Sequence, residues 1–358
     1  MTTFRNARDL LLLTFCEGSI TEDEFLLLYD LNTSKNPEYP YWDYKKFCLQ
    51  DKDEAECKTE FRFQKNDIPL LLNVLGLPEK ITCKQGTVCR GTEALCMLLK
   101  RLAYPCRYSD LMSTFGRPVP EISMISNQVV DFIFEHHSHR ITGWNHTVLN
   151  AHSLQIYADA VSNRGAALDN CFGFVDGTVR PICRPDLNQR LVYNGHKRVH
   201  ALQFQSVVTP NGLVANLYGP VEGKKHDAGM LRDSGLYNDL QRYAFSPTGQ
   251  PLCIYGDPAY PLRIHIQAPF RNGILTPQMQ NFNAAMSTVR TSVEWLFGDV
   301  VNSFCFLDFK KNLKIGLSQI GKMYIVCVLL RNALTCLYGN STSEFFNLDP
   351  PTLQEYFA

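Results

Sequence analysis

Apolar residues recur with a helical period in the first part of the chain. Leu95, Leu98, Leu99 and Leu102 lie at positions i, i+3, i+4 and i+7 of one helix face, and Pro105 ends this helix. The same period continues over residues 108–115, closed by a glycine, and over residues 119–136. Shorter helical stretches are expected at residues 10–15 and 22–31. The pattern predicts a helical N-terminal part.

After about residue 163 the pattern changes to short apolar runs separated by helical segments. Strands are expected at residues 171–176, 200–208, 213–218 and 252–255, and helices at 225–240 and 283–301. Residues 209–212, Thr-Pro-Asn-Gly, are a turn signal between two alternating segments and predict a β-hairpin. The fold class is therefore α/β, with a mixed sheet flanked by helices and preceded by an α-helical region.

These elements divide the chain into four segments. They are an acidic helical segment of unknown role at 1–82, a helical region at 83–162, an α/β domain at 163–340 and a C-terminal tail at 341–358. In the second segment, three short helices with a Gly-Arg-Pro turn before the last resemble a DNA-binding helix-turn-helix. Arg107 and Arg117 are its candidate DNA contacts, although Glu121 would repel phosphate. A three-helix packing module without DNA contact explains the same periodicity.

Composition narrows the class of protein. We expect a soluble, unsecreted chain without a membrane partner, since it has no run of about 18 apolar residues and no secretory apolar segment near its start. Thirteen cysteines without a C-x-x-C pair indicate reduced thiols, neither a disulfide framework nor a zinc knuckle. The net charge is zero, but residues 1–70 carry nine basic and fourteen acidic side chains, and residues 168–358 carry seventeen and fourteen. Only the later segments therefore suit a polyanionic partner.

Two aspartates follow apolar strands directly. Asp176 precedes a glycine after the first strand, and Asp257 follows a glycine after the fourth. An Asp-Gly pair alone also fits an ordinary turn. Two strand-end aspartates favour a site, because the carboxyl ends of neighbouring strands gather functional side chains in α/β sheets.

Glu294 lies on the last expected helix, at the edge of its apolar face. An unpaired carboxylate there is costly to bury, so it should be exposed, paired or bound to a metal. Arg290, one helical turn earlier, offers an i, i+4 ion pair as the simpler explanation.

Phosphodiester cleavage explains why three carboxylates would converge. Two divalent cations held by carboxylates can activate the attacking water and stabilise the leaving oxygen. Asp227, at the start of an expected helix, is a fourth candidate ligand, or else an N-cap. Lys224, Lys225 and His226 beside it are candidates for phosphate contacts, or a solvated charge run.

Four motifs resemble the DDE endonuclease family of Harbinger-type (PIF/Harbinger) transposases and their domesticated relatives. They are Val175-Asp-Gly-Thr178; His226-Asp227 with Leu231-Arg-Asp-Ser-Gly235; Gly256-Asp-Pro-Ala-Tyr-Pro261; and Val289-Arg-Thr-Ser-Val-Glu-Trp-Leu-Phe-Gly298. The resemblance covers about residues 90–340. It implies a ribonuclease H-like nuclease domain in which Asp176, Asp257 and Glu294 are the catalytic residues. With Asp227, these residues would bind two divalent cations, either Mg²⁺ or Mn²⁺. It also supports the helix-turn-helix interpretation, and Arg290 is a further candidate for DNA contact.

The resemblance further implies an endonuclease that cuts transposon ends in the nucleus, with strand transfer into a target site as a further activity. A Myb-like DNA-binding protein is the expected accessory partner, and a homo-oligomer is compatible with this role. Two alternatives remain open: a domesticated DNA-binding or adaptor protein that keeps the fold without transposition, and a hydrolase of another phosphate ester.

Overall fold

The computed structural model describes residues 4–32, 40–271 and 273–358, and these fall into two compact units, Met1–Tyr44 and Lys45–Ala358. Residues 1–3 and 33–39 of the predicted 1–82 segment lie outside the described residues. The unit boundary differs from the sequence-based division, because residues after 44 already belong to the second core. Buried Phe61, Phe63 and Leu71 are part of it.

The first unit is a pair of helices, α1 (Phe4–Cys16) and α2 (Glu22–Leu31), followed by the 3-10 turn η1 (Tyr41–Asp43). Both predicted helical stretches are confirmed, and Thr21 and Glu24 form a capping box at the start of α2. The rings of Phe15 and Phe25 stack across the pair at 4.7 Å. No residue of α2 is buried, so two helices of this size enclose no core.

The second unit begins with a helical region. Its elements are η2 (Leu49–Asp51), α3 (Glu54–Phe61), α4 (Asp67–Val74), β1 (Lys80–Thr82), β2 (Val88–Arg90), α5 (Gly91–Ala103), η3 (Tyr108–Leu111), α6 (Met112–Phe115), α7 (Val119–His137) and α8 (His139–Thr142). The three predicted helices are present as α5, η3 with α6, and α7. Leu95, Leu98, Leu99 and Leu102 of α5 are all buried, as their spacing predicts.

Helix α7, the expected recognition helix, packs against both α5 and α14 (Ile320–Tyr338). Pro120, Glu135 and His136 are its only exposed residues, since Ile122, Ile125 and neighbouring apolar residues point into the core. A recognition helix must present a continuous polar face to a DNA groove. The helix-turn-helix assignment therefore stays a prediction, and the packing of α7 is that of a core helix.

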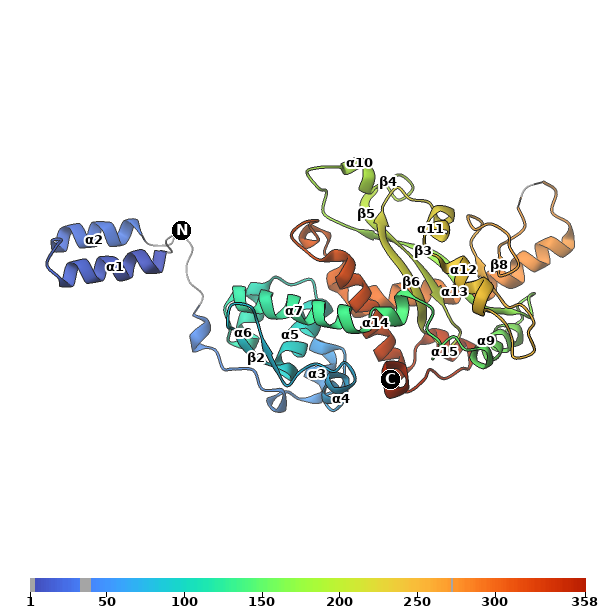
Figure 1. Ribbon diagram of the computed structural model, residues 1–358, viewed down its shortest axis with the longest axis horizontal. Helices are drawn as coiled ribbons and strands as arrows, with labels where there is room; N and C mark the ends of the chain where they lie inside the picture. Colours follow the sequence, from blue (N-terminus) through green and yellow to red (C-terminus); the bar gives the residue numbers. More distant parts are fainter. Residues whose placement is uncertain (1–3, 33–39, 272) are drawn as a thin grey trace. The chain divides into compact units, whose positions relative to one another are not determined.

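Six strands form the central sheet: β3 (Cys171–Pro181), β4 (Tyr193–Asn194), β5 (Val199–Val208), β6 (Val214–Glu222), β7 (Cys253–Gly256) and β8 (Ile266–Gln267). β5 pairs antiparallel with β3 on one side, and with β4 and β6 on the other. β3 and β8 both pair parallel with β7. The predicted α/β class and mixed sheet agree with this arrangement (Figure 1).

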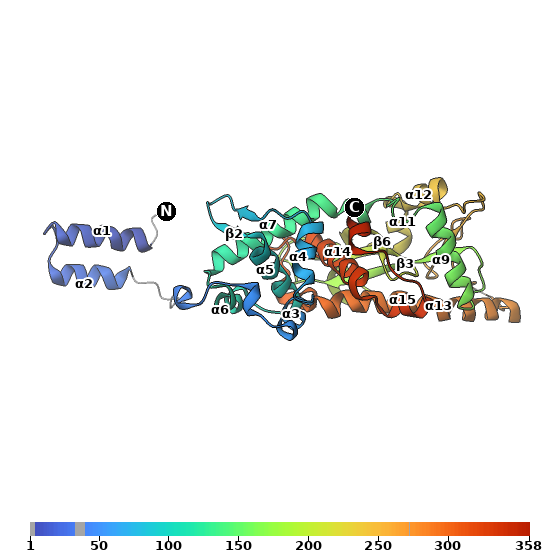
Figure 2. The same cartoon turned by 90° about the horizontal axis from the view of Figure 1, so that it is seen from below.

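Helices cover the sheet. They are α9 (Ala151–Asn163), α10 (Gln189–Val192), α11 (Asp227–Asp233), α12 (Leu236–Tyr243), α13 (Pro277–Ser303), α14, α15 (Ser341–Phe346) and α16 (Leu353–Phe357), with the 3-10 turns η4 (Cys305–Asp308) and η5 (Lys310–Asn312). α11 and α12 lie on one side of the strands, and α13 and α15 on the other (Figure 2). The single helix predicted at 225–240 is broken at Gly235, whose φ of 71° is left-handed.

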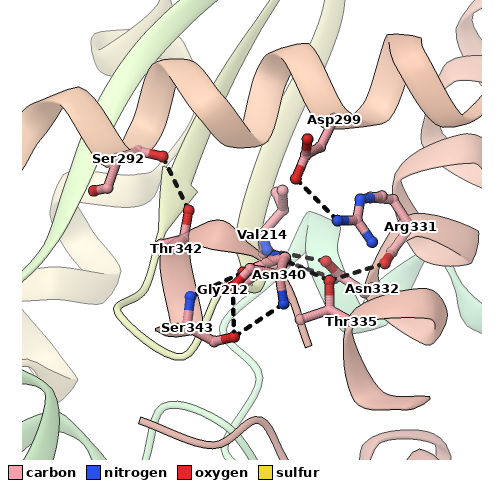
Figure 3. Close-up of polar contacts among 10 residues, drawn as sticks. All are labelled: Gly212, Val214, Ser292, Asp299, Arg331, Asn332, Thr335, Asn340, Thr342 and Ser343. Carbon is pink, nitrogen blue, oxygen red and sulfur yellow. Dashed lines mark hydrogen bonds and ion pairs between the residues drawn. The ribbon is translucent and has the colours of Figure 1, made fainter. Parts of the chain in front are cut away.

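A buried polar network fastens the hairpin to the last helices (Figure 3). The turn at residues 209–212 is confirmed, and Gly212 is required there because a Cβ would overlap the Asn340 side chain. Asn340 Nδ2 donates to Gly212 O at 2.8 Å. Asn332 of α14 accepts from Val214 N at 3.0 Å and donates to Val214 O at 2.9 Å.

The predicted tail at 341–358 is not detached from the α/β domain. It forms α15 and α16, and Leu353, Tyr356 and Phe357 are buried. Helix α14 is long and apolar enough to span a membrane by length and composition, but 78% of that window is buried inside the protein, as in a core helix. All thirteen cysteines are free thiols, in agreement with the sequence-based expectation.

Candidate functional site

Asp176 and Asp257 lie beside each other in the register of two parallel strands. The pairing of β3 with β7 ends at Val175 opposite Gly256, so each aspartate is the next residue of its chain segment. Asp176 is not at the end of its strand, as the Asp-Gly pair had suggested, because β3 stays paired with β5 as far as Pro181. The predicted meeting of the two aspartates nevertheless follows from the parallel register.

Asp176 is held by two donors. Arg290 Nη2 on α13 donates to Asp176 Oδ2 at 2.6 Å, and the Gly177 amide donates to Asp176 Oδ1 at 2.9 Å. Burial raises the pKa of Asp176 to about 6, against the opposing effect of the Arg290 guanidinium, and Asp257 and Asp227 raise it further. The site is therefore a desolvated acidic cluster with one compensating cation.

Asp227 is the first residue of α11 and lies against Gly177. A Cβ at position 177 would overlap Asp227 Oδ1, so the glycine makes room for this carboxylate. Burial raises the pKa of Asp227, and Asp257 raises it further. The alternative role as N-cap is not observed, since His226 occupies the cap position and no side chain caps the helix.

Asp257 sits in a tight turn after β7. The Ala259 amide donates to Asp257 Oδ1 at 2.8 Å and orients the carboxylate. A Cβ at Gly256 would fall 2.6 Å from the Tyr260 ring and 2.9 Å from Val175, so this approach of strand and turn requires glycine. Asp257 is half-buried, and its charge acts on both Asp176 and Asp227.

Glu294 is not part of this cluster. It is exposed, and the i, i+4 ion pair with Arg290 is absent because Arg290 pairs with Asp176 instead. Both side chains project from the same face of α13, one turn apart. Among the residues that the structure describes, no three acidic, histidine or cysteine side chains are close enough to hold a metal.

The candidate DNA contacts differ in accessibility. Arg107, Lys224 and His226 are exposed. Lys225 pairs with Asp233. Two arginines are not free: Arg290 is committed to Asp176, and Arg117 is held by Glu93 at 2.7 Å and Glu121 at 2.9 Å, with 13% of its side chain exposed. The geometry disfavours Arg117 as a phosphate contact.

Tyr260 also belongs to the site, although no role for it is expected from the sequence. Its ring is buried, its hydroxyl lies 3.5 Å from Gln205 Oε1, and burial raises its pKa, with further raising by the three aspartates. Tyr260 thus lies next to Gly256 and within electrostatic reach of the cluster. Its presence in the motif Gly256-Asp-Pro-Ala-Tyr260 was the available signal.

One comparison with known proteins bears on this site. Residues 175–332 match the family model described as DDE superfamily endonuclease. The matched segment begins one residue before Asp176 and includes Asp227, Asp257, Arg290 and Glu294. No curated protein and no solved structure matches the chain. The match supports the DDE endonuclease superfamily for this segment and suggests a transposase-like nuclease.

Proposed function

We propose that the chain is a divalent-metal-dependent DNA endonuclease of Harbinger transposase type, built on a ribonuclease H-like sheet, that acts in the nucleus on transposon ends. The observation that carries the proposal is that Asp176, Asp227 and Asp257 are electrostatic neighbours inside the segment that matches the DDE endonuclease model: the strand register sets Asp176 beside Asp257, and Asp227 lies against Gly177. The hairpin β5–β6, the helix α11 and the parallel strand β7 lie between the acids in the order that the resemblance implies.

The chemistry of the donors suits Mg²⁺ or Mn²⁺, although the carboxylates are not spaced for a metal in this structure. The donor set consists only of carboxylate oxygens, which hard divalent cations prefer, and burial leaves the negative charges in excess over the single cation, Arg290. We propose Asp176 and Asp257 as the principal ligands, with Glu294 and Asp227 completing the sites of two ions. When bound, these ions supply an activated water and stabilise the leaving 3′ oxygen.

Residues of the chain hold the carboxylates of the proposed metal site in fixed orientations. The Gly177 amide and Arg290 fix both oxygens of Asp176, and the Ala259 amide fixes one oxygen of Asp257. The buried Tyr260 side chain lies within electrostatic reach of all three aspartates and adds apolar surroundings to the site. Such fixed ligands bind substrate and cations at a lower reorganisation cost.

A plasmid-nicking assay tests the proposal. Wild-type protein should nick supercoiled DNA with Mn²⁺ or Mg²⁺ and not with chelator, whereas Asp176→Asn and Asp257→Asn should lose activity by at least about 100-fold. Asp159→Asn, an exposed aspartate on α9, is the matched control and should stay active. Equal nicking by all four proteins would refute the site.

One observation favours the adaptor hypothesis: Glu294 is exposed outside the acidic cluster, and Arg290 forms an ion pair with Asp176. Absence of cutting by wild-type protein, even with a Myb-like partner added, together with retained DNA binding, would favour this second function. Strand transfer and a homo-oligomeric state belong to the endonuclease proposal and are tested by joining assays and by sedimentation.

A further inference from the structure

We propose that the helix pair α1–α2 binds the same pair of a second copy of the chain, forming an antiparallel bundle of four helices. This surface is the one through which the homo-oligomeric state named above would form. The acidic cluster lies in the other unit, so association and nuclease activity are separate properties with separate tests.

The contact between α1 and α2 uses only part of each helix. The two helices lie side by side (Figure 1 and Figure 2), and the Phe15 ring stacks on Phe25 at 4.7 Å between centroids. The Arg8 guanidinium lies 4.7 Å from the centroid of the Tyr29 ring. Folded units of fewer than about 40 residues usually need a disulfide, a metal or association with another chain. Cys16 is a free thiol, and the described residues contain no group of ligands that could hold a metal, so association remains as the means of stabilising the pair.

Large apolar side chains are exposed on both helices. Residues 4–32 contribute eight of the 23 exposed large apolar side chains in the described part of the chain, so these side chains form a patch and are not isolated. They are Leu10, Leu12, Leu13 and Phe15 of α1, and Leu26, Leu27, Leu28 and Leu31 of α2. Leu10 and Leu13 are neighbours along one face of α1, as are Leu27 and Leu31 along one face of α2. Helices that carry apolar residues on this many sides are normally buried.

The exposed apolar surface is large enough for a stable dimer. Leu10, Leu13, Leu27 and Leu31 are each between 60% and 69% exposed. At roughly 100 Å² of apolar surface per side chain, six of the eight would supply about 600 Å² on each chain. Specific interfaces begin at about 600 Å² per partner and typically bury about 800 Å². In a four-helix bundle each helix contributes an apolar stripe to a shared core, and two copies of this pair provide the four stripes.

The charges of the pair favour an antiparallel arrangement. Four exposed acids surround the turn between the helices, namely Glu17, Glu22, Asp23 and Glu24. The open end has no net charge, because it carries Arg5, Arg8, Asp9 and Asp30. Two parallel copies would bring eight acids together at the turns, where they repel one another. A two-fold axis across the helices instead sets each acidic turn beside the neutral, arginine-containing end of the other copy.

Sedimentation velocity of the full chain between about 1 and 100 µM measures the association. Wild-type protein should sediment as a dimer, with twice the monomer mass of 40.8 kDa. The helix-pair triple variant Leu13→Gln, Leu27→Gln, Leu31→Gln keeps good helix formers and should raise the dimer dissociation constant at least about 100-fold.

The matched control removes three exposed leucines of the second unit. The triple variant Leu187→Gln, Leu191→Gln, Leu317→Gln should dimerise as wild type does.

Cross-linking at Cys16, an exposed thiol, tests the orientation. In the antiparallel bundle the two Cys16 thiols lie at opposite ends of helices about 20 Å long, beyond the reach of a bis-maleimide of about 10 Å. Cross-linked dimers in wild type that are absent in Cys16→Ser would overturn the antiparallel arrangement.

A monomer at every concentration would overturn the proposal, as would equal dissociation constants of the two triple variants at native melting temperatures. A wild-type monomer whose melting temperature falls in the helix-pair triple would assign these leucines to a contact within one chain. The nuclease proposal fails separately. If wild type dimerises through the helix pair but never cuts DNA, the nuclease proposal falls and the helix-pair proposal stands. If wild type cuts as a monomer, only the helix-pair proposal falls.

Discussion

Arg290 and Asp176 are 114 positions apart in the sequence, yet the guanidinium of one lies 2.6 Å from the carboxylate of the other. This pair joins α13 to β3 and neutralises one charge of a buried acidic cluster. A cation bound by the same carboxylate would compete with Arg290 for its charge. If the proposed metal binds at Asp176, the pair therefore links the stability of the metal-free protein to metal binding.

Replacing Arg290 should change stability and metal response together. Arg290→Gln leaves the Asp176 charge poorly compensated, at a cost of about 2–3 kcal/mol for a pair with 21% and 17% side-chain exposure. In chelator the melting temperature should fall, and the rise produced by Mn²⁺ should be larger than in wild type. Arg232→Gln, which removes an arginine with 80% side-chain exposure, is the control. An equal Mn²⁺ effect in all three proteins would contradict the linkage.

Glu294 distinguishes a metal ligand from a surface residue. The structure gives it no role in the metal-free protein, so Glu294→Gln should leave the free energy of unfolding in chelator within about 0.5 kcal/mol of wild type. If it completes the metal site, the same variant should lose at least about tenfold in nicking rate with Mn²⁺. Glu135→Gln, an exposed glutamate on α7, should lose nothing. Full activity of Glu294→Gln would remove it from the site.

Local spacing predicted the features of the fold that depend on local chemistry. The helix face of Leu95 to Leu102 and the turn before Leu213 follow from periodicity and turn residues, and the adjacency of Asp176 and Asp257 follows from the two apolar segments that precede them. The ion pair of Arg290 with Asp176 could not be predicted from local spacing. A spacing rule offers the neighbour four residues away, whereas the packing of α13 against β3 brings Asp176 closer.

The sequence also does not show which candidate side chains are accessible to DNA. Arg117 lies in the Gly-Arg-Pro turn before an expected recognition helix, and this position predicts DNA contact. In the structure, the Arg117 guanidinium instead donates to Glu93, which lies 24 residues earlier. The extent of β3 beyond Asp176 was also missed, because pairing with β5 overrides the turn tendency of Asp-Gly.

Asn332 should be a strong determinant of stability. Its amide satisfies the Val214 N–H and C=O and also donates to Tyr356 Oη at 2.8 Å, all in the buried core. Asn332→Leu leaves these buried groups without a hydrogen-bond partner, and the free energy of unfolding should fall by about 2–4 kcal/mol. Urea denaturation measures the change. Asn302→Leu, at an exposed position of α13, should change it by less than about 1 kcal/mol, and equal effects would argue against the network.

His137 should make the protein sensitive to mild acid. Burial lowers its pKa below the ordinary value of 6.5, with Arg140, His136 and His139 acting in the same direction, while its bond to Leu75 O opposes them. The unfolded chain then binds a proton that the native protein excludes, so stability should fall as the pH drops below about 6.5 and be unaffected above it. His137→Gln should flatten the melting temperature between pH 6.5 and 5. An unchanged slope there, or the same flattening in exposed His152→Gln, would contradict this assignment.

The division into two units predicts where the chain can be shortened. Lys45–Ala358 contains its own core, so removing residues 1–44 should leave its melting temperature within about 2 °C of the full chain. Removing residues 1–80 deletes Phe61, Phe63 and Leu71 from that core and should abolish cooperative unfolding. Differential scanning calorimetry of both truncations measures this. A cooperative transition in residues 81–358, or its loss in residues 45–358, would show that the boundary lies elsewhere, because only a segment outside the core can be removed without exposing buried side chains.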